Sequence, residues 1–200
     1  MGYETHARVL NALDFDVPQC RKRAVIIAVP KGRAFAFPVP EFPFRERTAG
    51  EVLDGLPKAV SPPEPPLAHN HVDVTPERDR YRISFVPEGL WLSKAEGAPP
   101  GVVRRLTPKD STKFRRLDRN RPSLTLRCGE ALYHPTEDRY ITPREAARIQ
   151  GFPDTYVLEG PIRRRTGVVR TLDQHRQVAN AVPPPLAQAV ASHVRTALCL

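Results

Sequence analysis

The 200-residue chain has no long apolar run, and its mean hydropathy is negative, at −0.43. A membrane helix needs roughly 18 or more consecutive apolar residues, so the sequence predicts no transmembrane span. The N-terminus, Met1–His6, carries no basic segment followed by an apolar one, so no secretory signal is expected. Both absences favour a cytoplasmic protein without membrane contact.

Cysteine is also scarce. Cys20, Cys128 and Cys199 are far apart and odd in number, which disfavours a disulfide framework and a cysteine-based zinc site. No phosphate-binding glycine loop is present. The pattern His69-x-His71-x-Asp73 lacks a further clustered ligand, so a polar loop is the better interpretation and no metal is expected.

Lysine is rare as well, although the chain is strongly basic. Six lysines leave 25 arginines among 31 basic residues, against 22 acidic ones, and the net charge is +9. The planar guanidinium group matches phosphates and the edge of guanine, so a polyanionic partner is favoured. A genome rich in arginine codons is the alternative explanation. The 23 prolines predict that much of the chain is loop.

Two strands are predicted near the N-terminus, over Arg8–Ala12 and Ala24–Val29, separated by a turn at Phe15–Gln19. The second run is apolar on both faces, as in a strand buried on both sides of an α/β sheet. Two strands cannot cover both of their own faces. The sequence therefore predicts an incomplete sheet.

Further elements follow from capping and periodicity. We expect helices over Thr48–Leu56, from Thr142 through Ile149, and over Pro183–Leu200, the first two with Thr and Glu in a capping box. A strand is predicted at Tyr81–Val86 and an extended linker at Ser61–Pro66.

Alternation in an extended chain places Gln19, Arg21 and Arg23 on one face at the entrance of the stronger strand. Buried guanidinium groups need a carboxylate, a phosphate or a base carbonyl. An edge strand with solvated arginines is the alternative. Cys20 alternates away from this face, so a nucleophilic role is not expected for it.

A dense basic block, interleaved with apolar residues, lies between Val102 and Arg127. Such a block favours a surface that follows the DNA phosphates over a merely solvated basic face. Its candidate DNA-binding residues are Arg104, Arg105, Lys113, Arg115, Arg116, Arg119 and Arg121.

Three segments resemble conserved blocks of the DNA cytosine-5 methyltransferases, in the family's order. Val9–Ala12 with Val17–Arg23 is similar to the eighth block, Arg139–Asp154 to the ninth, and Gln177–Pro184 to the tenth. Pro122–Leu126 is similar to the Pro-Ser-x-Thr-Ile-Thr segment, with its final hydroxyl replaced. The resemblance covers almost the whole chain.

The resemblance implies an α/β fold: the last strands and C-terminal helix of a Rossmann-like catalytic domain, plus a small, irregular, mostly β target-recognition domain. The implied division is 1–44 for the catalytic strands, 45–160 for target recognition with the ninth block, and 161–200 for the return to the catalytic domain. The variable region, about residues 45–127, is expected to read the DNA through its major groove.

The resemblance also implies the chemistry, which is transfer of a methyl group from S-adenosylmethionine to C5 of a cytosine flipped out of double-stranded DNA. Arg23 is then expected to hold the carbonyl oxygen of that cytosine, with Arg21 and Gln19 bracing the base pocket. Asn180, Ala181 and Val182 are expected to wall the cofactor site. The ninth-block residues expected to organise the recognition domain are Arg139, Arg144, Glu145 and Arg148.

The sequence departs from the family at Ala179 and Asp16, where the family usually has glycine. It also lacks the Pro-Cys nucleophile, the Glu-Asn-Val motif and the N-terminal Phe-x-Gly-x-Gly loop. Alone the chain is expected to be inactive, and to work with an N-terminal methyltransferase subunit that carries these motifs. The alternatives are an inactive truncated remnant and a stand-alone DNA-binding module.

Overall fold

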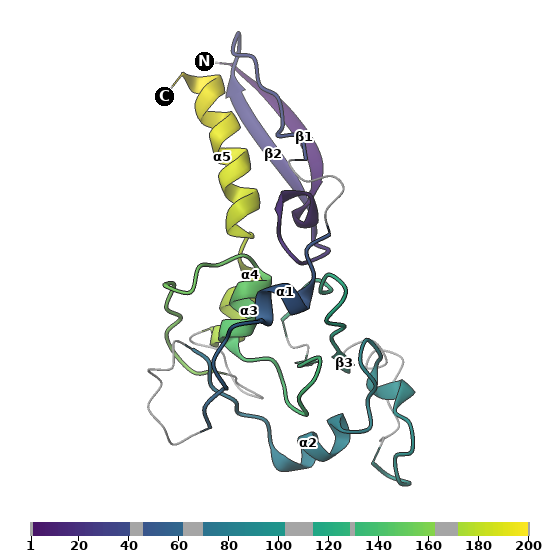
Figure 1. Cartoon of the computed structure of the whole chain (residues 1–200). Helices are drawn as coiled ribbons and strands as arrows, with labels where there is room; N and C mark the ends of the chain where they lie inside the picture. Colours follow the sequence, from purple (N-terminus) through teal and green to yellow (C-terminus); the bar gives the residue numbers. More distant parts are fainter. Residues whose placement is uncertain are drawn as a thin grey trace.

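The computed structural model describes residues 2–40, 46–61, 70–102, 114–128, 131–162 and 172–199. An antiparallel strand pair and a long C-terminal helix form one end of the molecule, and short helices with irregular segments form the other (Figure 1). Both termini lie at the strand-pair end. The elements, in chain order, are β1 (Tyr3–Asn11), η1 (Ala12–Phe15), β2 (Lys22–Pro30), α1 (Ala49–Leu53), α2 (Glu77–Ile83), η2 (Leu92–Lys94), β3 (Phe114–Arg116), β4 (Ala131–Tyr133), α3 (Pro143–Ile149), α4 (Gln174–Asn180) and α5 (Pro184–Leu198).

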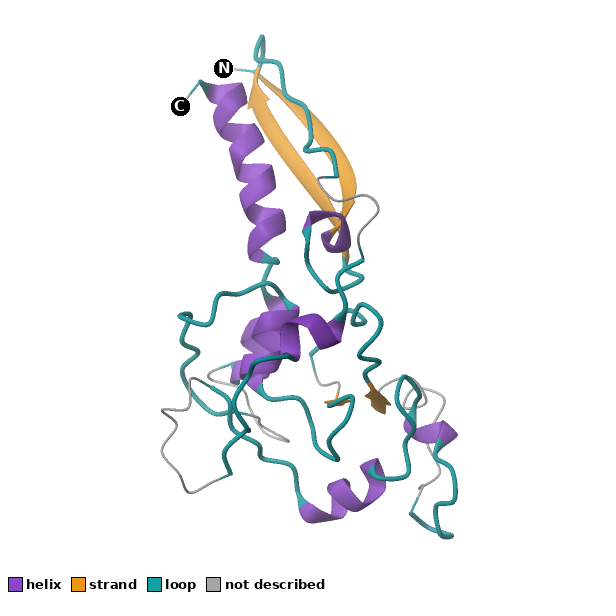
Figure 2. Cartoon of the chain, viewed as in Figure 1, coloured by secondary structure: helices purple, strands orange, loops and turns teal. Residues whose placement is uncertain are grey.

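The first two strands confirm the sequence prediction: β1 begins earlier than predicted and ends one residue sooner, at Asn11, and β2 is longer at both ends. β1 pairs antiparallel with β2, and Ala7 lies opposite Ile26 in the register. One face of the pair packs into a small core that includes Leu10 and Leu186 of α5, with Phe37 packed against it. The long helix therefore lies alongside the strands (Figure 2).

The opposite face of this strand pair is bare. Val9 is 62% exposed and Ile26 is 68% exposed, whereas Leu10 and Val29 on the covered face are buried. The second strand is therefore not buried on both sides in this chain by itself, which agrees with the predicted incomplete sheet. The strand is apolar on both faces, as the sequence indicates, and its uncovered face leaves large aliphatic side chains in solvent.

The main core lies where α1, α3 and α4 meet (Figure 2). It contains Val52, Leu117, Ile149 and Val178, which come from four distant parts of the sequence. Helix α3 begins with the predicted capping box: the Thr142 hydroxyl accepts from the Glu145 N–H, and the Glu145 carboxylate accepts from the Thr142 N–H. The helices predicted to start at Thr48 and at Thr142 are thus confirmed, although α1 is shorter than expected.

The predicted strand at Tyr81–Val86 is wrong, because helix α2 occupies Glu77–Ile83. Pro76 precedes its first turn, where acidic side chains suit the helix dipole. The Arg82 and Asp79 side chains add an ion pair one turn apart (3.6 Å). Ile83 is fully buried in a second core. The proline and acidic residues at its start and this burial outweigh the alternating aromatic and aliphatic pattern.

The region 45–160 is irregular, as expected, but it is not mostly β. Its described residues contain two three-residue strands, β3 and β4, which pair in parallel, beside the helices α1, α2 and α3. Frequent prolines and buried side-chain hydrogen bonds take the place of extended ladders there. None of the helices in the described parts of the chain combines the length and the hydropathy that a bilayer span requires.

Candidate active site

A buried polar cluster joins the three family-like blocks, and we call it the glutamine–arginine node. It consists of Gln19 and Arg21 from the segment before β2, Gln150 at the end of α3, and the main chain of Leu126 and Ala181. The side chains of Gln19, Arg21 and Gln150 are at most 2% exposed. Residues more than 100 positions apart therefore meet in one solvent-excluded site.

Arg21 is held by main-chain carbonyl groups. Its guanidinium donates to the carbonyls of Leu126 (3.0 Å), Ala179 (2.6 Å) and Ala181 (3.3 Å). Among the described residues no carboxylate forms an ion pair with it, so burial is uncompensated by an opposite charge. Burial, together with the smaller effect of the nearby charge of Arg23, lowers the pKa of Arg21 to about 10.

Arg23 differs from its neighbours on the same face because it is exposed. Its guanidinium donates to the carbonyl of Lys22 (2.7 Å). Gln19 and Arg21 point into the protein, and Arg23 lies where the strand leaves the node. The structure thus separates two buried supporting groups from one accessible cation.

The segment expected to wall the cofactor site follows directly after the node. Asn180 ends α4 and is exposed, and its side-chain oxygen lies 2.9 Å from the thiol of Cys128. Val182 is 57% exposed, while the carbonyl of Ala181 between them is fixed by Gln150 (2.7 Å). A polar amide and an aliphatic side chain are therefore presented outward from a fixed main chain.

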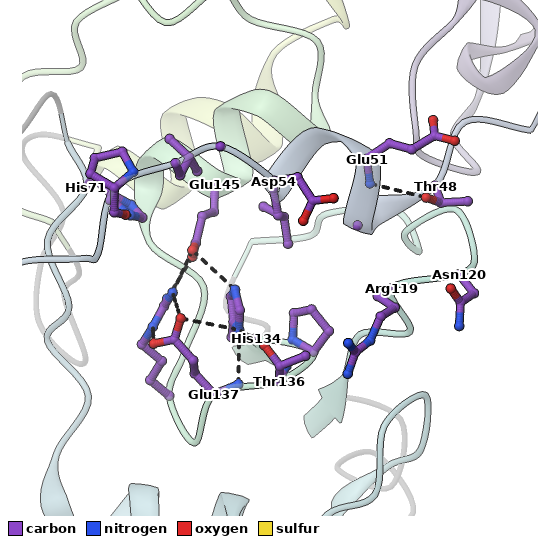
Figure 3. Close-up of a pocket in the computed structure, with 17 residues that line it drawn as sticks. Thr48, Glu51, Asp54, His71, Arg119, Asn120, His134, Thr136, Glu137 and Glu145 are labelled. Carbon is purple, nitrogen blue, oxygen red and sulfur yellow. Dashed lines mark hydrogen bonds and ion pairs between the residues drawn. The ribbon is translucent and has the colours of Figure 1, made fainter.

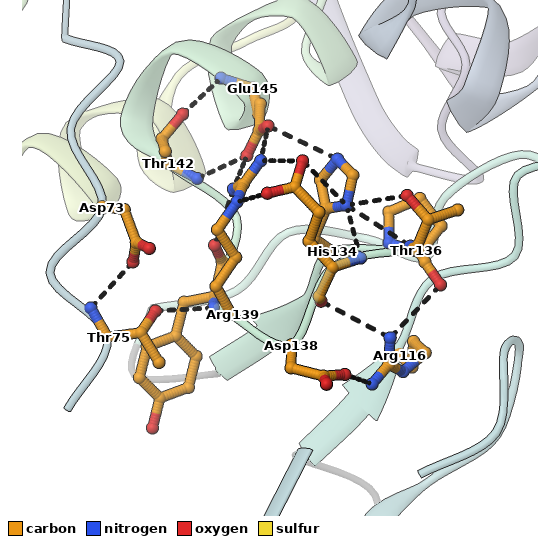
Figure 4. A network of polar contacts seen from close by, with 12 residues as sticks. Asp73, Thr75, Arg116, His134, Thr136, Asp138, Arg139, Thr142 and Glu145 are labelled. Atoms are coloured by element: carbon orange, nitrogen blue, oxygen red, sulfur yellow. Dashed lines mark hydrogen bonds and ion pairs between the residues drawn. The ribbon is translucent and has the colours of Figure 1, made fainter. Parts of the chain in front are cut away.

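The ninth-block residues form a second polar network, centred on a buried ion pair (Figure 4). The guanidinium of Arg139 makes two parallel hydrogen bonds to Glu145, of 2.7 and 2.8 Å, and both side chains are 3% exposed. Glu145 also accepts from the Thr142 N–H, and Arg139 bonds the partly exposed Glu137. This network lines a cleft of about 580 Å³ beside α1 (Figure 3).

The other two ninth-block arginines connect segments. Arg144 donates to the carbonyls of Pro153 (3.2 Å) and Tyr156 (2.7 Å). Arg148 pairs with Asp154 and donates to the carbonyl of Val52 in α1 and to that of Asp54 just after it. These contacts hold the turn after α3 and the end of α1 in place. Arg144 and Arg148 therefore support the fold.

The pKa directions in the ninth-block network follow from its geometry. Burial by itself raises the pKa of Glu145, but the hydrogen bonds and charge of Arg139 outweigh it, so this pKa lies below its ordinary value. Burial lowers the pKa of His134, more than Glu145 raises it. The Nδ1 of His134 accepts main-chain N–H groups of Thr136 and Glu137, so the neutral ring fits the site.

We expect the free energy of unfolding to decrease as the pH falls, and we expect protonation of His134 to account for part of that decrease. The neutral ring is favoured in the folded state, so unfolding takes up a proton below the ordinary histidine pKa of 6.5. The stabilising contribution is present above that pH and is lost as the pH falls. Urea unfolding at about pH 7.5 and about pH 5.5 should show a smaller loss for His134→Asn, which keeps an acceptor but does not titrate in this range. An equal loss in both proteins would contradict the assignment.

The basic block is only partly within the described residues. Arg104, Arg105 and Lys113 lie outside them. Arg116 is buried and donates to the carbonyl of Ile83 (2.6 Å) and to Asp138 (2.5 Å), so its guanidinium is engaged inside the protein. The three remaining side chains are more accessible. Arg115 lies over the Trp91 ring, Arg119 bonds to Glu88, and Arg121 lies near Asp118.

The His-x-His-x-Asp pattern forms no metal centre in the part of the chain that the structure describes. His71 is buried and uses both ring nitrogens within the protein, with Thr142 Oγ1 and the Pro57 carbonyl each at 2.8 Å. Asp73 pairs with Arg80, and His69 lies outside the described residues. These contacts fit the polar-loop interpretation.

The two departures from the family pattern are accommodated differently. Asp16 has a left-handed backbone (φ 58°), the conformation that glycine reaches at lower cost, and its carboxylate pairs with Arg47 at 3.0 Å. The Ala179 side chain packs in the main core, and its carbonyl accepts from Arg21. Neither substitution disrupts the glutamine–arginine node.

Sequence reasoning missed several members of the site. Gln150 lies in the segment similar to the ninth block, and the sequence predicts no individual role for it, although it makes three hydrogen bonds in the node. Helix α4 was also missed, and Asp173 was the available signal, since its side chain caps the helix through the Arg176 N–H. The carbonyl acceptors could not be found, because any residue type supplies one.

Comparisons with known proteins agree with the resemblance. The family model for C-5 cytosine-specific DNA methylase matches residues 1–196. The Type II methyltransferase M1.HphI of Haemophilus parahaemolyticus is 33% identical, over 97% of this chain and 48% of its own length. M.Eco47II of Escherichia coli is also 33% identical, over 97% of this chain and 46% of its own length.

A solved structure supports the fold. A prophage-encoded protein of Escherichia coli, described as a DNA modification methyltransferase, aligns with a TM-score of 0.67 at 20% identity, over 99% of this chain and 62% of that one. The overall architecture is thus the mixed α/β fold of methyltransferases. The chain spans about half the length of the curated relatives that it matches. It belongs to the C-5 cytosine-specific DNA methylase family.

Proposed function

We propose that this chain is the C-terminal, target-recognising part of a DNA cytosine-5 methyltransferase that acts on double-stranded DNA. The observation that carries the proposal is the glutamine–arginine node, which brings the eighth, ninth and tenth blocks into one buried site. In an inactive remnant, no selection for activity would maintain matched hydrogen bonds between segments so far apart in the sequence. The catalytic cysteine belongs to a first-half polypeptide, which carries the cofactor loop as well.

Arg23 holds the carbonyl oxygen of the flipped cytosine. Gln19 and Arg21, which are buried behind it, support the base pocket. A flipped base is read by hydrogen bonds to its polar edge, and an exposed cation at the end of a braced strand is suited to this. Residues 1–44 and 161–200 belong to the Rossmann-like catalytic domain. Residues 45–160 form the recognition domain, which reads the DNA through its major groove.

Asn180, Ala181 and Val182 form one wall of the site for S-adenosylmethionine, which supplies the methyl group when bound. The exposed amide of Asn180 and the exposed aliphatic side chain of Val182 suit a ligand with a polar and an apolar portion. The hydrogen bonds that Gln150 and Arg21 donate to the Ala181 carbonyl fix the main chain between them. The remaining walls come from the first-half polypeptide.

The surface of the chain supports such a partner. The bare face of the strand pair exposes Val9 and Ile26, and a mainly apolar groove of about 710 Å³ runs between β2 and α5, lined by residues such as Val190. Contiguous apolar surface of this kind marks an interface. The two surfaces are adjacent, since Ile26 borders both, so one partner can cover them together.

The experiment that tests the proposal begins with the gene. The DNA upstream of the Met1 codon should encode the glycine loop, Pro-Cys and Glu-Asn-Val. Co-expression with that first-half polypeptide should give transfer of labelled methyl groups from S-adenosylmethionine to duplex DNA, with neither part active alone. A broken upstream frame, or an inactive pair, would favour a remnant. Salt-dependent DNA binding by this chain alone, without a partner, would favour a stand-alone module.

A charge on the bare face should abolish assembly. Ile26→Asp places a carboxylate that must be desolvated in the interface, so we expect binding of the first-half polypeptide to weaken by about 100-fold or more. The matched control is Tyr81→Asp, at a large exposed side chain on α2. Co-purification and calorimetry measure both. Equal binding by the two variants would place the interface elsewhere.

A further inference from the structure

Gln150 occupies the centre of the glutamine–arginine node, and the direction of its amide is fixed. Its Nε2 donates to the carbonyls of Val178 (3.2 Å) and Ala181 (2.7 Å), and its Oε1 accepts from Gln19 (2.6 Å). Main-chain carbonyl oxygens only accept hydrogen bonds, so the amide cannot flip without placing oxygen against oxygen. Gln150 is fully buried.

The amide of Gln19 continues the same chain of bonds. Its Oε1 accepts from the main-chain N–H of Leu126 (3.2 Å) and from Arg21 (3.4 Å), which leaves its Nε2 to donate to Gln150. A directed path thus runs from the Leu126 N–H through two glutamines to the Ala181 carbonyl. Every side-chain amide oxygen and nitrogen on this path has a hydrogen-bond partner, which favours a rigid arrangement.

Gln19 and Ala181 on this path belong to different parts of the proposed site. Gln19 lies four residues before Arg23 and leads into β2, and Ala181 lies between Asn180 and Val182. Close packing reinforces the link at α3, since an added Cβ at Gly151 would lie 2.8 Å from Cδ of Pro185 at the start of α5. The end of α3 is therefore joined to both segments.

We propose that Gln150 is a positioning residue, which sets the Asn180–Val182 wall relative to the Arg23 base pocket through its two-sided amide. The inference rests on the proposed function, because it takes the roles of these segments from there. Gln150 itself touches neither base nor cofactor. Its effect passes through the Ala181 carbonyl on one side and through Gln19 on the other.

Two substitutions separate the two sides of the amide. Gln150→Met keeps the length of the side chain and removes all three hydrogen bonds. Gln150→Glu keeps an acceptor for Gln19 and, in place of the two donors, turns a carboxylate oxygen that both carbonyls repel toward Val178 and Ala181. The matched control is Gln177→Met on α4, which also loses two amide bonds to carbonyls, those of Glu159 and Leu172, outside the node.

Amide hydrogen exchange on the full chain reads the coupling directly. With Gln150→Met, the amides of Leu126 and Ala181 should both exchange about tenfold faster or more, because each loses support worth about one buried hydrogen bond. With Gln150→Glu only Ala181 should change. The Ala146 amide inside α3 should stay protected in both. Unchanged exchange at Leu126 and Ala181, or an equal loss throughout α3, would overturn the proposal.

Kinetics of the assembled enzyme test the positioning role itself. Gln150→Met should raise the KM for S-adenosylmethionine and lower kcat, each about tenfold, while the Kd for duplex DNA stays unchanged. Gln177→Met should leave all three constants unaltered. Unchanged kinetic constants in Gln150→Met would overturn the role. If the unsubstituted pair is inactive, the proposed function has failed, and the exchange experiment still decides whether the two segments are coupled.

Discussion

Replacing Glu145 with alanine is expected to lower the free energy of unfolding by about 3–5 kcal/mol, the cost of leaving one member of a buried ion pair without its partner. Arg139 and Glu145 are each 3% exposed and share two short hydrogen bonds. Without the carboxylate, the guanidinium of Arg139 stays buried and the Thr142 N–H loses its acceptor. The capping box of α3 is broken at the same time.

Glu137→Ala is the matched control, because Glu137 also pairs with Arg139 but its side chain is 46% exposed. Solvent screens that pair, so a loss of about 1 kcal/mol or less is expected. Urea unfolding followed by circular dichroism measures both variants at neutral pH. Similar losses in the two variants would mean that the buried pair contributes no more than a surface one.

Much of the secondary structure could be predicted, because its causes are local. Thr142, Pro143 and Glu145 specify the start of α3 by capping alone, and Gly151 ends it with a positive φ of 85°. The β-branched run in β2 and the apolar face of α5 are equally local signals. Where the structure differs, as in α2, a tertiary contact such as the burial of Ile83 decides the outcome.

The residues of the candidate site could be predicted less well than the elements that carry them. Gln19 and Arg21 stood out by alternation, but the sequence could not show that one strand position is buried and the next in the series, Arg23, is exposed. That difference depends on Leu126 and Ala181, which approach from distant segments and offer main-chain carbonyl groups to Arg21. Side-chain patterns contain no information on such acceptors.

Arg23→Ala is expected to reduce methylation by the assembled enzyme by about 100–1,000-fold in kcat/KM, the usual cost of removing one aligned donor from a reacting group. The exposed guanidinium is free to meet a base carbonyl, while the strand behind it is fixed by the buried Arg21. Because Arg23 is not part of any core, the variant should fold and bind the first-half polypeptide as before.

Arg8→Ala is the control for charge, since Arg8 is an exposed cation of the same strand pair, opposite Val25. It should leave methylation within about twofold, because Arg8 holds no group of the base in the proposed site and water weakens the effect of an exposed charge. Arg23→Lys keeps the charge but not the forked donor, and its activity should fall between the two. Activity in Arg23→Ala equal to that in Arg8→Ala would remove Arg23 from the base pocket. If Arg23→Lys retains full activity, the pocket requires a positive charge at this position and not the geometry of a guanidinium.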